Sequence, residues 1–487
     1  MRLWIWIAAM IAIALAGGWA EQRLAVASEF FRDPSHSYDV AYAFTLPIHL
    51  VQSAYPGWPV LAALWGMLAC LALAGWQLAR ALGVAGRPAL VVASFIAVAA
   101  VLTSFSTVHS GDLYYYVMYG RLYGLHGLNP YALGAAPVAA GDQVIAQIAG
   151  YTKNPPYGDP YGPLWTLMAG GIARLEAGAS LWWQAWSYRA LAVAAAALVL
   201  AALLYVLRRE PPQERCRRAA LFAFHPLVLY ETAVGGHNEI LMLAPAAWAF
   251  ALVDELPLLA GVLLGASVAI KYVSVLALPF LIAIAWRKSA VAGVLCGLFA
   301  IAIPSLCFRP FWLGDSTLHA ASGNINVLAM SPSWLLSWPF FAAGTAGLPV
   351  FGGVPALPLV GVLTWPRLIQ LLLVFGFLCV AAWSAIRFVK DQSFAHLWRT
   401  VTGFIWASPI VHPWYLLWLA PAVSATGRWA VYAWWFAALI PLRYILEGLA
   451  IQSTWALVSL TGVIFAVPVF IAMRTGAKAS GLQERAQ

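Results

Sequence analysis

Charged residues are the scarcest class of residue in this sequence. Of its 487 residues, 9% are Asp, Glu, Lys or Arg, whereas 63% are hydrophobic. A soluble globular protein carries roughly 25% charged residues, so a water-soluble fold would leave too much apolar surface uncovered. The composition therefore excludes a soluble domain and predicts an all-α polytopic membrane protein that lies in a lipid bilayer.

Cysteine and the common cofactor motifs are also scarce or missing. The five cysteines are scattered along the chain without metal-type spacing, which argues against a disulfide framework and a structural metal. The sequence has no Gly-rich phosphate loop, no HExxH pair and no DxD motif. Because a nucleotide-sugar donor usually needs a metal at its diphosphate, such a donor is disfavoured. We expect neither a metal nor a cofactor.

The net charge of +9 comes from small basic clusters between apolar runs. No single basic patch forms, so a nucleic-acid partner is not expected. The pattern is typical of cytoplasmic loops under the positive-inside rule. The clusters are Arg80 and Arg87, Arg208 to Arg218, Arg287 and Lys288, Arg387 to Arg399, and Arg474 and Lys478.

Apolar runs predict a helical bundle with about 11 to 14 spans, since each span needs about 20 apolar residues. The clearest runs are near 3–20, 58–79, 89–108, 181–207 and 367–388, the first being either an uncleaved helix or a signal peptide. Residues 161–178 fit a re-entrant or surface helix. We expect residues 1–487 to form one integral membrane domain, with extracytoplasmic loop regions at 109–160 and 306–365 carrying short interfacial helices.

This threading places a set of polar side chains on the outer face of the membrane. Ionisable residues at a membrane boundary are costly, so each is a candidate functional residue. Ordinary alternatives stay open: Asp112 as a helix cap, Glu239 as a partner of a helix dipole, and Lys271 as a side chain that snorkels to lipid headgroups. The set is Asp112, His126, His237, Asn238, Glu239, Lys271, Asp315 and His412.

A lipid-phosphate sugar donor fits this set of side chains. Its phosphate is already a good leaving group, so the reaction needs only a base for the incoming hydroxyl and a cation for the phosphate. Asp112 is the candidate base, because it opens a polar and Tyr-rich stretch directly after an apolar run. Lys271 is the candidate cation.

Four stretches together resemble a known family. They are "GDLYYYVMYGRLYGLHGLNPY" (111–131), "DPYGPLW" (159–165), "GGHNEILML" (235–243) and "VHPWYLLW" (411–418). In this order they resemble the polyprenyl-phosphate-mannose-dependent mannosyltransferases of the GT-C superfamily, in particular the actinobacterial membrane α-mannosyltransferases that extend lipomannan. The resemblance implies a GT-C-like multi-span fold with an active site on the extracytoplasmic side.

The resemblance also implies roles for individual residues. Asp112 matches the family's catalytic base, and Lys271 matches its apolar-flanked lysine. Glu239 stands where the family more usually has Asp. The remaining matches, expected to bind substrate, are Arg121, Asn129, Pro130, Tyr131, His237 and Asn238.

The resulting hypothesis is an inverting transfer of a hexose, with mannose favoured, from a polyprenyl-phosphate donor to a lipid-linked or glycan acceptor at the plasma membrane. Asp112 takes the acceptor's proton, and Lys271, with Arg121 or His237, holds the departing phosphate. Asn238 and the tyrosines, among them Tyr115 and Tyr131, orient the sugar, and His412 is a further candidate contact. Alternatives are another polyprenyl-phosphate sugar (arabinose, aminoarabinose, glucose or galactose) and a lipid-sugar flippase, which predicts charges at mid-span.

Overall fold

The computed structural model describes residues 2–27, 51–52, 58–104, 107–108, 110–132, 141–151, 158–314, 317, 328–348, 350, 363–444 and 454–484. Most of these residues are helical, which confirms the predicted all-α polytopic membrane protein. The chain divides into two compact units, one of residues 1–322 with 423–425, and one of residues 323–422 with 426–487.

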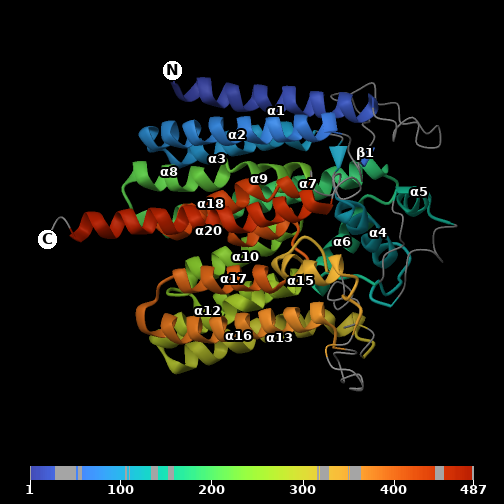
Figure 1. Cartoon of the computed structure of the whole chain (residues 1–487). Coiled ribbons are helices and arrows are strands. Elements are labelled where there is room, and N and C mark those ends of the chain that lie inside the picture. The colour runs from blue at the N-terminus through green and yellow to red at the C-terminus, as the bar shows by residue number, and fades with distance from the viewer. Residues whose placement is uncertain are drawn as a thin grey trace. The chain divides into compact units, whose positions relative to one another are not determined.

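The first unit holds the site, and its elements are shown in Figure 1. Long helices pack side by side, α1 on α2, α2 on α8, α7 on α10, and α11 on α13. The elements are α1 (Arg2–Ala27), β1 (Val51–Gln52), α2 (Trp58–Ala85), α3 (Pro88–Thr103), β2 (Thr107–Val108), α4 (Asp112–Gly124), α5 (Gln143–Tyr151), α6 (Pro163–Leu175), α7 (Leu181–Val206), η3 (Leu207–Arg209), α8 (Pro212–Ala223), α9 (Pro226–Leu229), η4 (Tyr230–Val234), α10 (Glu239–Leu252), α11 (Pro257–Ile270), η5 (Tyr272–Ala277), α12 (Leu278–Lys288), α13 (Ala290–Phe308) and η6 (Arg309–Phe311). The strands β1 and β2 pair in parallel over two residues each.

The second unit is built from paired helices as well. Helix α16 packs on α15 and α17, and α18 packs on α20. Its elements are α15 (Pro332–Ala342), α16 (Trp365–Asp391), α17 (Ala395–Ala407), most of η8 (Pro413–Ser424), α18 (Arg428–Leu439) and α20 (Thr454–Glu484).

Six helices among the described residues are long and apolar enough to cross a membrane. Four of them coincide with predicted runs, namely Leu3–Ala20, Ala62–Ala85, Leu181–Arg209 and Trp365–Asp391; the others are Ala290–Phe311 and Leu457–Thr475. Helices α3, α10 and α11 are apolar but shorter, at 16, 14 and 14 residues. Prolines divide other apolar stretches, as where Pro226 begins α9 directly after α8. The total of about 11 to 14 spans stays a prediction.

The two ends of the helices in the first unit carry different polar residues. At one end, Arg208 forms an ion pair of 2.9 Å with Glu255, and Lys288 donates to the carbonyl oxygens of Asp254 and Glu255 at 3.2 Å. Helix α10 separates these residues from Glu239, which lies at its opposite end. The structure thus groups the predicted inner-face residues at one end of α7, α10 and α12. Which side of the membrane this end faces stays a prediction.

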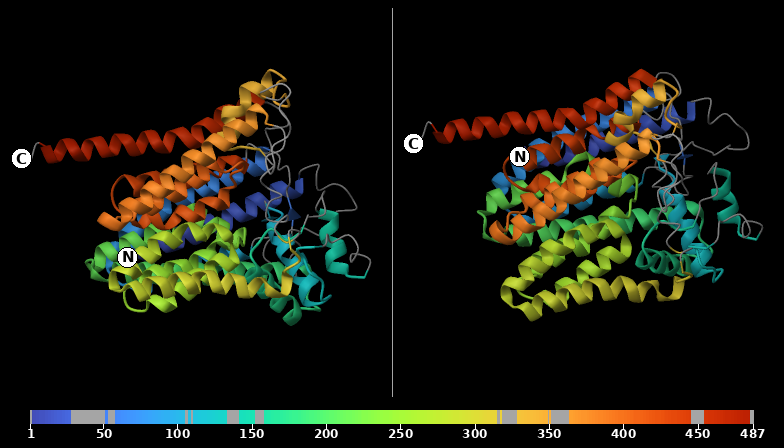
Figure 2. Two further views of the ribbon diagram at one scale, coloured as in Figure 1. Left: turned by 90° about the horizontal axis from the view of Figure 1, so that it is seen from below. Right: turned by 60° about the horizontal axis from the view of Figure 1, so that its bottom comes forward.

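Helices α4, α5 and α6 gather at the other end of the first unit, and the views in Figures 1 and 2 agree on this placement. They occupy the stretch 109–178, which was expected to carry helices that do not span. Helix α6 has 13 residues, about 20 Å at 1.5 Å per residue, and is too short to cross the hydrocarbon core. In the predicted loop region 306–365, residues 315–316, 318–327, 349 and 351–362 lie outside the described residues, and Asp315 is one of them.

Candidate active site

Asp112 is the first residue of α4, and its side chain is partly exposed, at 19%. The N-cap residue is Gly111, whose carbonyl oxygen accepts hydrogen bonds from the amides of Tyr114 and Tyr115 at 3.1 Å. Asp112 therefore does not cap the helix. A carboxylate in a first turn is stabilised by the positive end of the helix dipole. Its own amide donates to the hydroxyl of Ser110 at 3.2 Å.

The carboxylate of Asp112 points to His237, which lies in the turn between η4 and α10. The Oδ2 atom of Asp112 is 3.6 Å from Nδ1 of the imidazole. Two glycines make this turn possible. Gly236 has a φ of +64°, and a Cβ atom added to Gly235 would lie 2.5 Å from the His237 ring. The stretch "GGH" thus lets the imidazole pack against bare backbone.

A second carboxylate contacts the other side of the same imidazole. The Oε2 atom of Glu231, in η4, is 3.3 Å from Nε2 of His237, and both side chains are buried. Burial by itself would lower the pKa of His237, but Asp112, Glu231 and Glu239 outweigh it and raise that pKa above its usual value. The neighbouring carboxylates therefore favour the charged imidazolium more than water does for a free histidine side chain.

Lys271 follows the last residue of α11, and its ammonium group is turned toward α10. It contacts the carboxylate of Glu239, donates to Oδ1 of Asn238 at 3.3 Å, and lies 5.4 Å from the ring centre of Tyr161. Glu239 is fully buried, and 15% of the Lys271 side chain is exposed. These contacts disfavour the alternative in which Lys271 snorkels to headgroups, because its charge is held by a buried partner.

Asn238 and two tyrosines connect the Asp112 end of the site with Lys271. The amide of Asn238 donates to the hydroxyl of Tyr116 at 3.2 Å, and Tyr116 lies one helical turn after Asp112 on α4. The ring of Tyr161 packs edge-on against Tyr116 at 5.0 Å and also faces Lys271. Side chains from α4, α10, α11 and the segment before α6 therefore converge on one place.

The segment "DPYGP" is fixed tightly to the end of α11. The amide of Gly162 donates to the carbonyl of Ile270 at 3.0 Å, and a Cβ atom on Gly162 would lie 2.2 Å from the carbonyl oxygen of Ala269. Only glycine permits this approach. The hydroxyls of Tyr131 and Tyr272 donate to the Tyr161 carbonyl at 2.8 and 2.7 Å. Tyr161 is thus held beside Lys271 by three elements.

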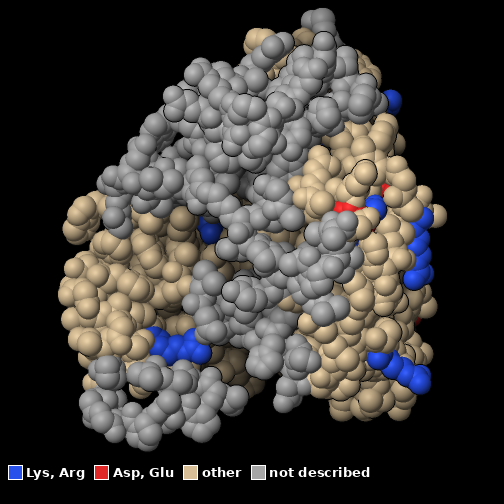
Figure 3. All heavy atoms as spheres, turned by 90° about the vertical axis from the view of Figure 1, so that its right-hand side faces the viewer, with Lys and Arg blue, Asp and Glu red and all other residues tan. Residues whose placement is uncertain are grey.

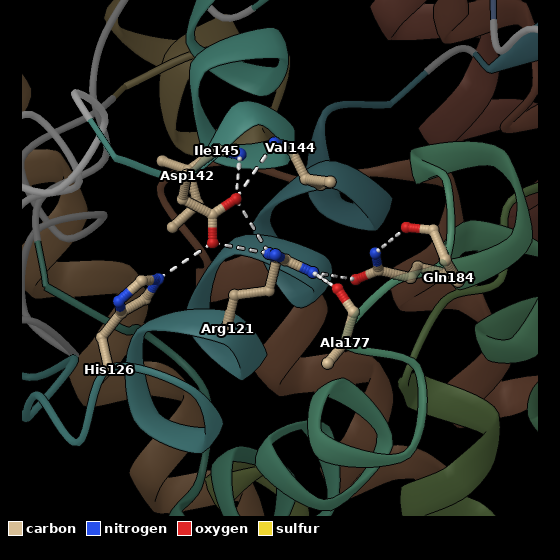
Figure 4. A network of polar contacts seen from close by, with 8 residues as sticks. Arg121, His126, Asp142, Val144, Ile145, Ala177 and Gln184 are labelled. Carbon is tan, nitrogen blue, oxygen red and sulfur yellow. Dashed lines mark hydrogen bonds and ion pairs between the residues drawn. The ribbon is translucent and has the colours of Figure 1, made fainter.

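Arg121 lies in a separate network, drawn in Figure 4. Its Nε donates to both carboxylate oxygens of Asp142, at 3.1 and 2.8 Å, and its Nη1 donates to the Ala177 carbonyl and to Gln184, each at 3.3 Å. His126 contacts the same Asp142 at 2.9 Å. Burial alone would raise the pKa of Asp142. The hydrogen bonds from Arg121 and His126 together have the larger effect, and the pKa is below its usual value. This geometry favours a structural role for Arg121 over the predicted phosphate contact.

Comparisons with known proteins indicate one family. The sequence model described as "Alpha-(1->6)-mannopyranosyltransferase, N-terminal domain" matches residues 6–287. The chain belongs to this mannopyranosyltransferase family. A "Probable alpha-(1->6)-mannopyranosyltransferase" of Mycolicibacterium smegmatis is 25% identical over 382 residues, which are 69% of this chain and 65% of that protein. The chain thus spans just under two thirds of the relative's length.

The region matched to the mannopyranosyltransferase family contains the whole site around Asp112, His237 and Lys271. His412 lies outside it, in the second unit, where its ring stacks on Trp414 at 4.4 Å. Its predicted contact with substrate stays a prediction. Asn129 accepts a hydrogen bond from the amide of Tyr131 at 3.1 Å, which holds a turn, and donates to the Phe311 carbonyl at 3.0 Å, which ties this turn to η6. The half-buried Tyr115 lies on α4 near Gly111.

Three residues of the candidate site were not among the predicted site residues: Glu231, Tyr116 and Tyr161. The sequence did contain a signal for Glu231. Placing its charge in an apolar stretch costs as much free energy as placing that of Glu239, so it is equally a candidate functional residue. Tyr161 lies inside one of the four quoted motifs. Tyr116 could not be separated from its two neighbouring tyrosines, because only the helix phase shows which ring turns toward Asn238.

Few charged side chains of the described residues reach the surface on the face that Figure 3 shows. In Figure 3 most of the described atoms on this face belong to uncharged residues, with Lys, Arg, Asp and Glu in small separate groups. Of the acids of the site, Glu231 and Glu239 are completely buried, whereas Asp112 is partly exposed. In the ranges that the structure describes, no three His, Cys, Asp or Glu side chains are arranged to hold a metal ion.

Proposed function

We propose that this protein transfers a mannosyl residue from a polyprenyl-phosphate donor to a hydroxyl group of a lipid-linked or glycan acceptor, with inversion at the anomeric carbon. One observation carries the proposal. A partly exposed carboxylate, Asp112, and a partly exposed ammonium, Lys271, are held at the same end of the helices through Asn238, Tyr116 and Tyr161. A base and a cation are the two groups that this transfer requires.

The proposed step is a single displacement. The acceptor oxygen forms a bond to the anomeric carbon while the bond between that carbon and the phosphate oxygen breaks. The electron pair of the broken bond leaves with the phosphate, and the hydroxyl proton passes to Asp112. Because charge grows on the phosphate as the bond breaks, an ammonium group placed there stabilises the transition state more than the ground state.

Exposure of the three carboxylates supports inversion. A retaining reaction by double displacement needs a second carboxylate as nucleophile. Glu231 is held by His237 and Glu239 by Lys271, and both are buried, whereas 19% of the Asp112 side chain is exposed. Asp112 alone is therefore placed to meet an acceptor, and one carboxylate suffices for a single displacement.

The Lys271–Glu239 pair suits a lipid phosphate. Glu239 keeps the ammonium charged in a region of low polarity, and the partly exposed lysine side chain leaves a side from which a phosphate can approach. The apolar surroundings strengthen such a contact relative to water. A polyprenyl chain would remain in the bilayer beside the apolar helices.

Family membership supports mannose as the sugar, since both the matching family and the relative from Mycolicibacterium smegmatis carry an alpha-(1->6)-mannopyranosyltransferase description. The placement of the basic residues supports an extracytoplasmic site at the plasma membrane. Arg208 and Lys288 lie at the opposite end of the helices from Asp112 and Lys271, as the positive-inside rule requires for an outer site.

Purified protein in detergent, offered a panel of labelled polyprenyl-phosphate sugars with oligomannoside and lipid-linked acceptors, tests the proposal. We expect mannose transfer by the wild type and transfer at least about 10²-fold slower by Asp112→Asn. If only a different sugar is transferred, that sugar takes the place of mannose in the proposed function. Absence of product from every donor would contradict the proposal and favour the flippase alternative, since a flippase makes no product in detergent.

A further inference from the structure

His237 lies between two carboxylates from different elements. Its Nδ1 is 3.6 Å from Asp112 on α4, and its Nε2 is 3.3 Å from Glu231 on η4. All three groups are in one row, with the partly exposed Asp112 at one end and the buried Glu231 at the other. The proposed reaction uses Asp112, but it does not explain why the row continues to a buried acid.

Hydrogen-bond chemistry determines the charge of the middle group. An ionised carboxylate only accepts hydrogen bonds, and a neutral imidazole carries one N–H. The imidazolium is the form that can direct an N–H toward each carboxylate. Glu231 therefore favours the state of His237 in which Nδ1 carries a proton directed at Asp112.

Other charged and titratable groups face His237 from the elements packed around it. Only an anionic group among them could replace the effect of Glu231, because a neighbouring cation disfavours the imidazolium. Arg189 of α7 lies beside Gly236, Tyr116 of α4 binds the amide of Asn238, and Lys271 is paired with Glu239 of α10. Glu239 already has its own cation. Of the carboxylates that the structure describes, Glu231 and Asp112 are the two in ion-pair contact with the imidazole.

We propose that Glu231 is a positioning residue for mannosyl transfer: it keeps His237 protonated. The protonated His237 then holds Oδ2 of Asp112, which leaves Oδ1 to receive the acceptor's proton. The inference rests on the proposed function. Glu231 itself does not touch the substrate, because its side chain is buried behind His237.

The proposal predicts a specific dependence on pH. If the imidazolium is needed, kcat falls at high pH as His237 loses its proton. Removing the charge of Glu231 lowers the pKa of His237, because a cation that loses an anionic neighbour gives up its proton more easily. The alkaline limb of the kcat profile then moves to lower pH.

Glu231→Gln is the decisive variant, because its amide oxygen still accepts a hydrogen bond from Nε2 while the charge is gone. We expect its alkaline limb to move down by about one pH unit or more, with donor KM within about twofold of the wild type and recovery of kcat at low pH. Glu231→Asp keeps the charge and should leave the limb near its wild-type position. Glu255→Gln, at the opposite end of the helices, is the matched control and should leave the profile unchanged.

A loss of kcat that is equal at every pH, or a limb that does not move, would overturn the proposal. Should Glu231→Gln fail to fold, a comparison of His237→Asn with the double variant His237→Asn/Glu231→Gln decides, since the double variant removes both buried charges. Residues that act through one another are not additive, so we expect equal kcat in these two proteins within about twofold. A further drop of tenfold or more in the double variant would contradict the inference.

Failure of the inference and failure of the proposed function give different results. If the protein is not a mannosyltransferase, the wild type makes no product and there is no profile to shift. If the wild type transfers mannose and the limb stays in place in Glu231→Gln, the function stands and the role of Glu231 is refuted.

Discussion

Lys271 and Glu239 meet at the ends of two antiparallel helices. The ammonium group of Lys271 follows the last turn of α11, and the Glu239 carboxylate belongs to the first turn of α10. Each charge therefore lies at the helix end whose dipole stabilises it. Such a pair contributes to the fold even without a substrate, so a functional role for Lys271 has to be separated from a structural one.

Paired variants make this separation. Lys271→Met leaves the fully buried Glu239 without its cation, which we expect to lower the free energy of unfolding by about 3–5 kcal/mol and to abolish transfer. Adding Glu239→Gln removes the stranded charge and should regain most of the stability, as measured by thermal unfolding in detergent. Transfer should not return, because the cation for the phosphate is still missing. A double variant with normal turnover would show that Lys271 has only a structural role.

Asp112→Asn should reduce kcat by about 10²–10⁴-fold, the range for a lost general base. The amide cannot take the acceptor's proton but has nearly the same shape, and the side chain is partly exposed, so thermal unfolding should change little. Single-turnover transfer from labelled donor measures the effect. Glu214→Gln, which changes a carboxylate on α8 outside the candidate site, is the control. Wild-type turnover by Asp112→Asn would refute the assignment of the base.

The stereochemistry of the donor can be predicted as well. A single displacement inverts the anomeric carbon, so an α-linked product requires a β-linked polyprenyl-phosphate mannose. We expect product from the β-linked donor and none from a synthetic α-linked one, with the product's anomeric configuration read by NMR. An α product from the α-linked donor would point to double displacement and to a second carboxylate as nucleophile.

Hydropathy and basic clusters were sufficient to predict the helical membrane fold and the separation of two polar ends. The reason is that a span's length and the placement of Arg and Lys are set by the bilayer, which acts on each segment independently. Four predicted runs match the long apolar helices directly. The number of spans was harder to predict, because prolines such as Pro226 divide apolar stretches into pieces shorter than a membrane.

Contacts between distant segments were less predictable than the end of the helices at which a residue lies. Asp112, His237 and Lys271 were expected at the same end of the helices, but the pairing of His237 with Glu231 depends on the Gly235 turn and on the π-helical η4. Arg121 shows the same limit. Its sequence neighbours do not reveal that Asp142, 21 residues later, holds its guanidinium.

The Arg121–Asp142 pair predicts a loss of stability at low pH. The pKa of Asp142 is below its ordinary value of 3.8, mainly because bonds from Arg121 and His126 outweigh burial. A carboxylate with a lowered pKa stabilises the fold above its unfolded-state pKa, and this contribution is lost as pH falls through the folded-state value. Arg121→Met should therefore destabilise the protein by about 3–5 kcal/mol at neutral pH, and the gap to wild type should shrink below about pH 4.

Thermal unfolding of both proteins in detergent between pH 3 and 8 measures this gap. A variant as stable as the wild type at neutral pH would show that the guanidinium is not structural. A stable Arg121→Met variant that no longer binds the donor would instead support the prediction that Arg121 contacts the phosphate.

Asp159 predicts the opposite dependence on pH. Complete burial raises its pKa to about 7, although the hydroxyl of Thr166 and the amide of Tyr161 both donate to its carboxylate. Between its ordinary value of 3.8 and pH 7 the folded protein holds a proton that the unfolded chain has lost, so stability falls as pH rises through this window. Asp159→Asn cannot ionise. Its stability relative to the wild type should therefore increase from pH 4 to 7 and level off above, whereas a difference that is flat across this range would show that Asp159 keeps an ordinary pKa.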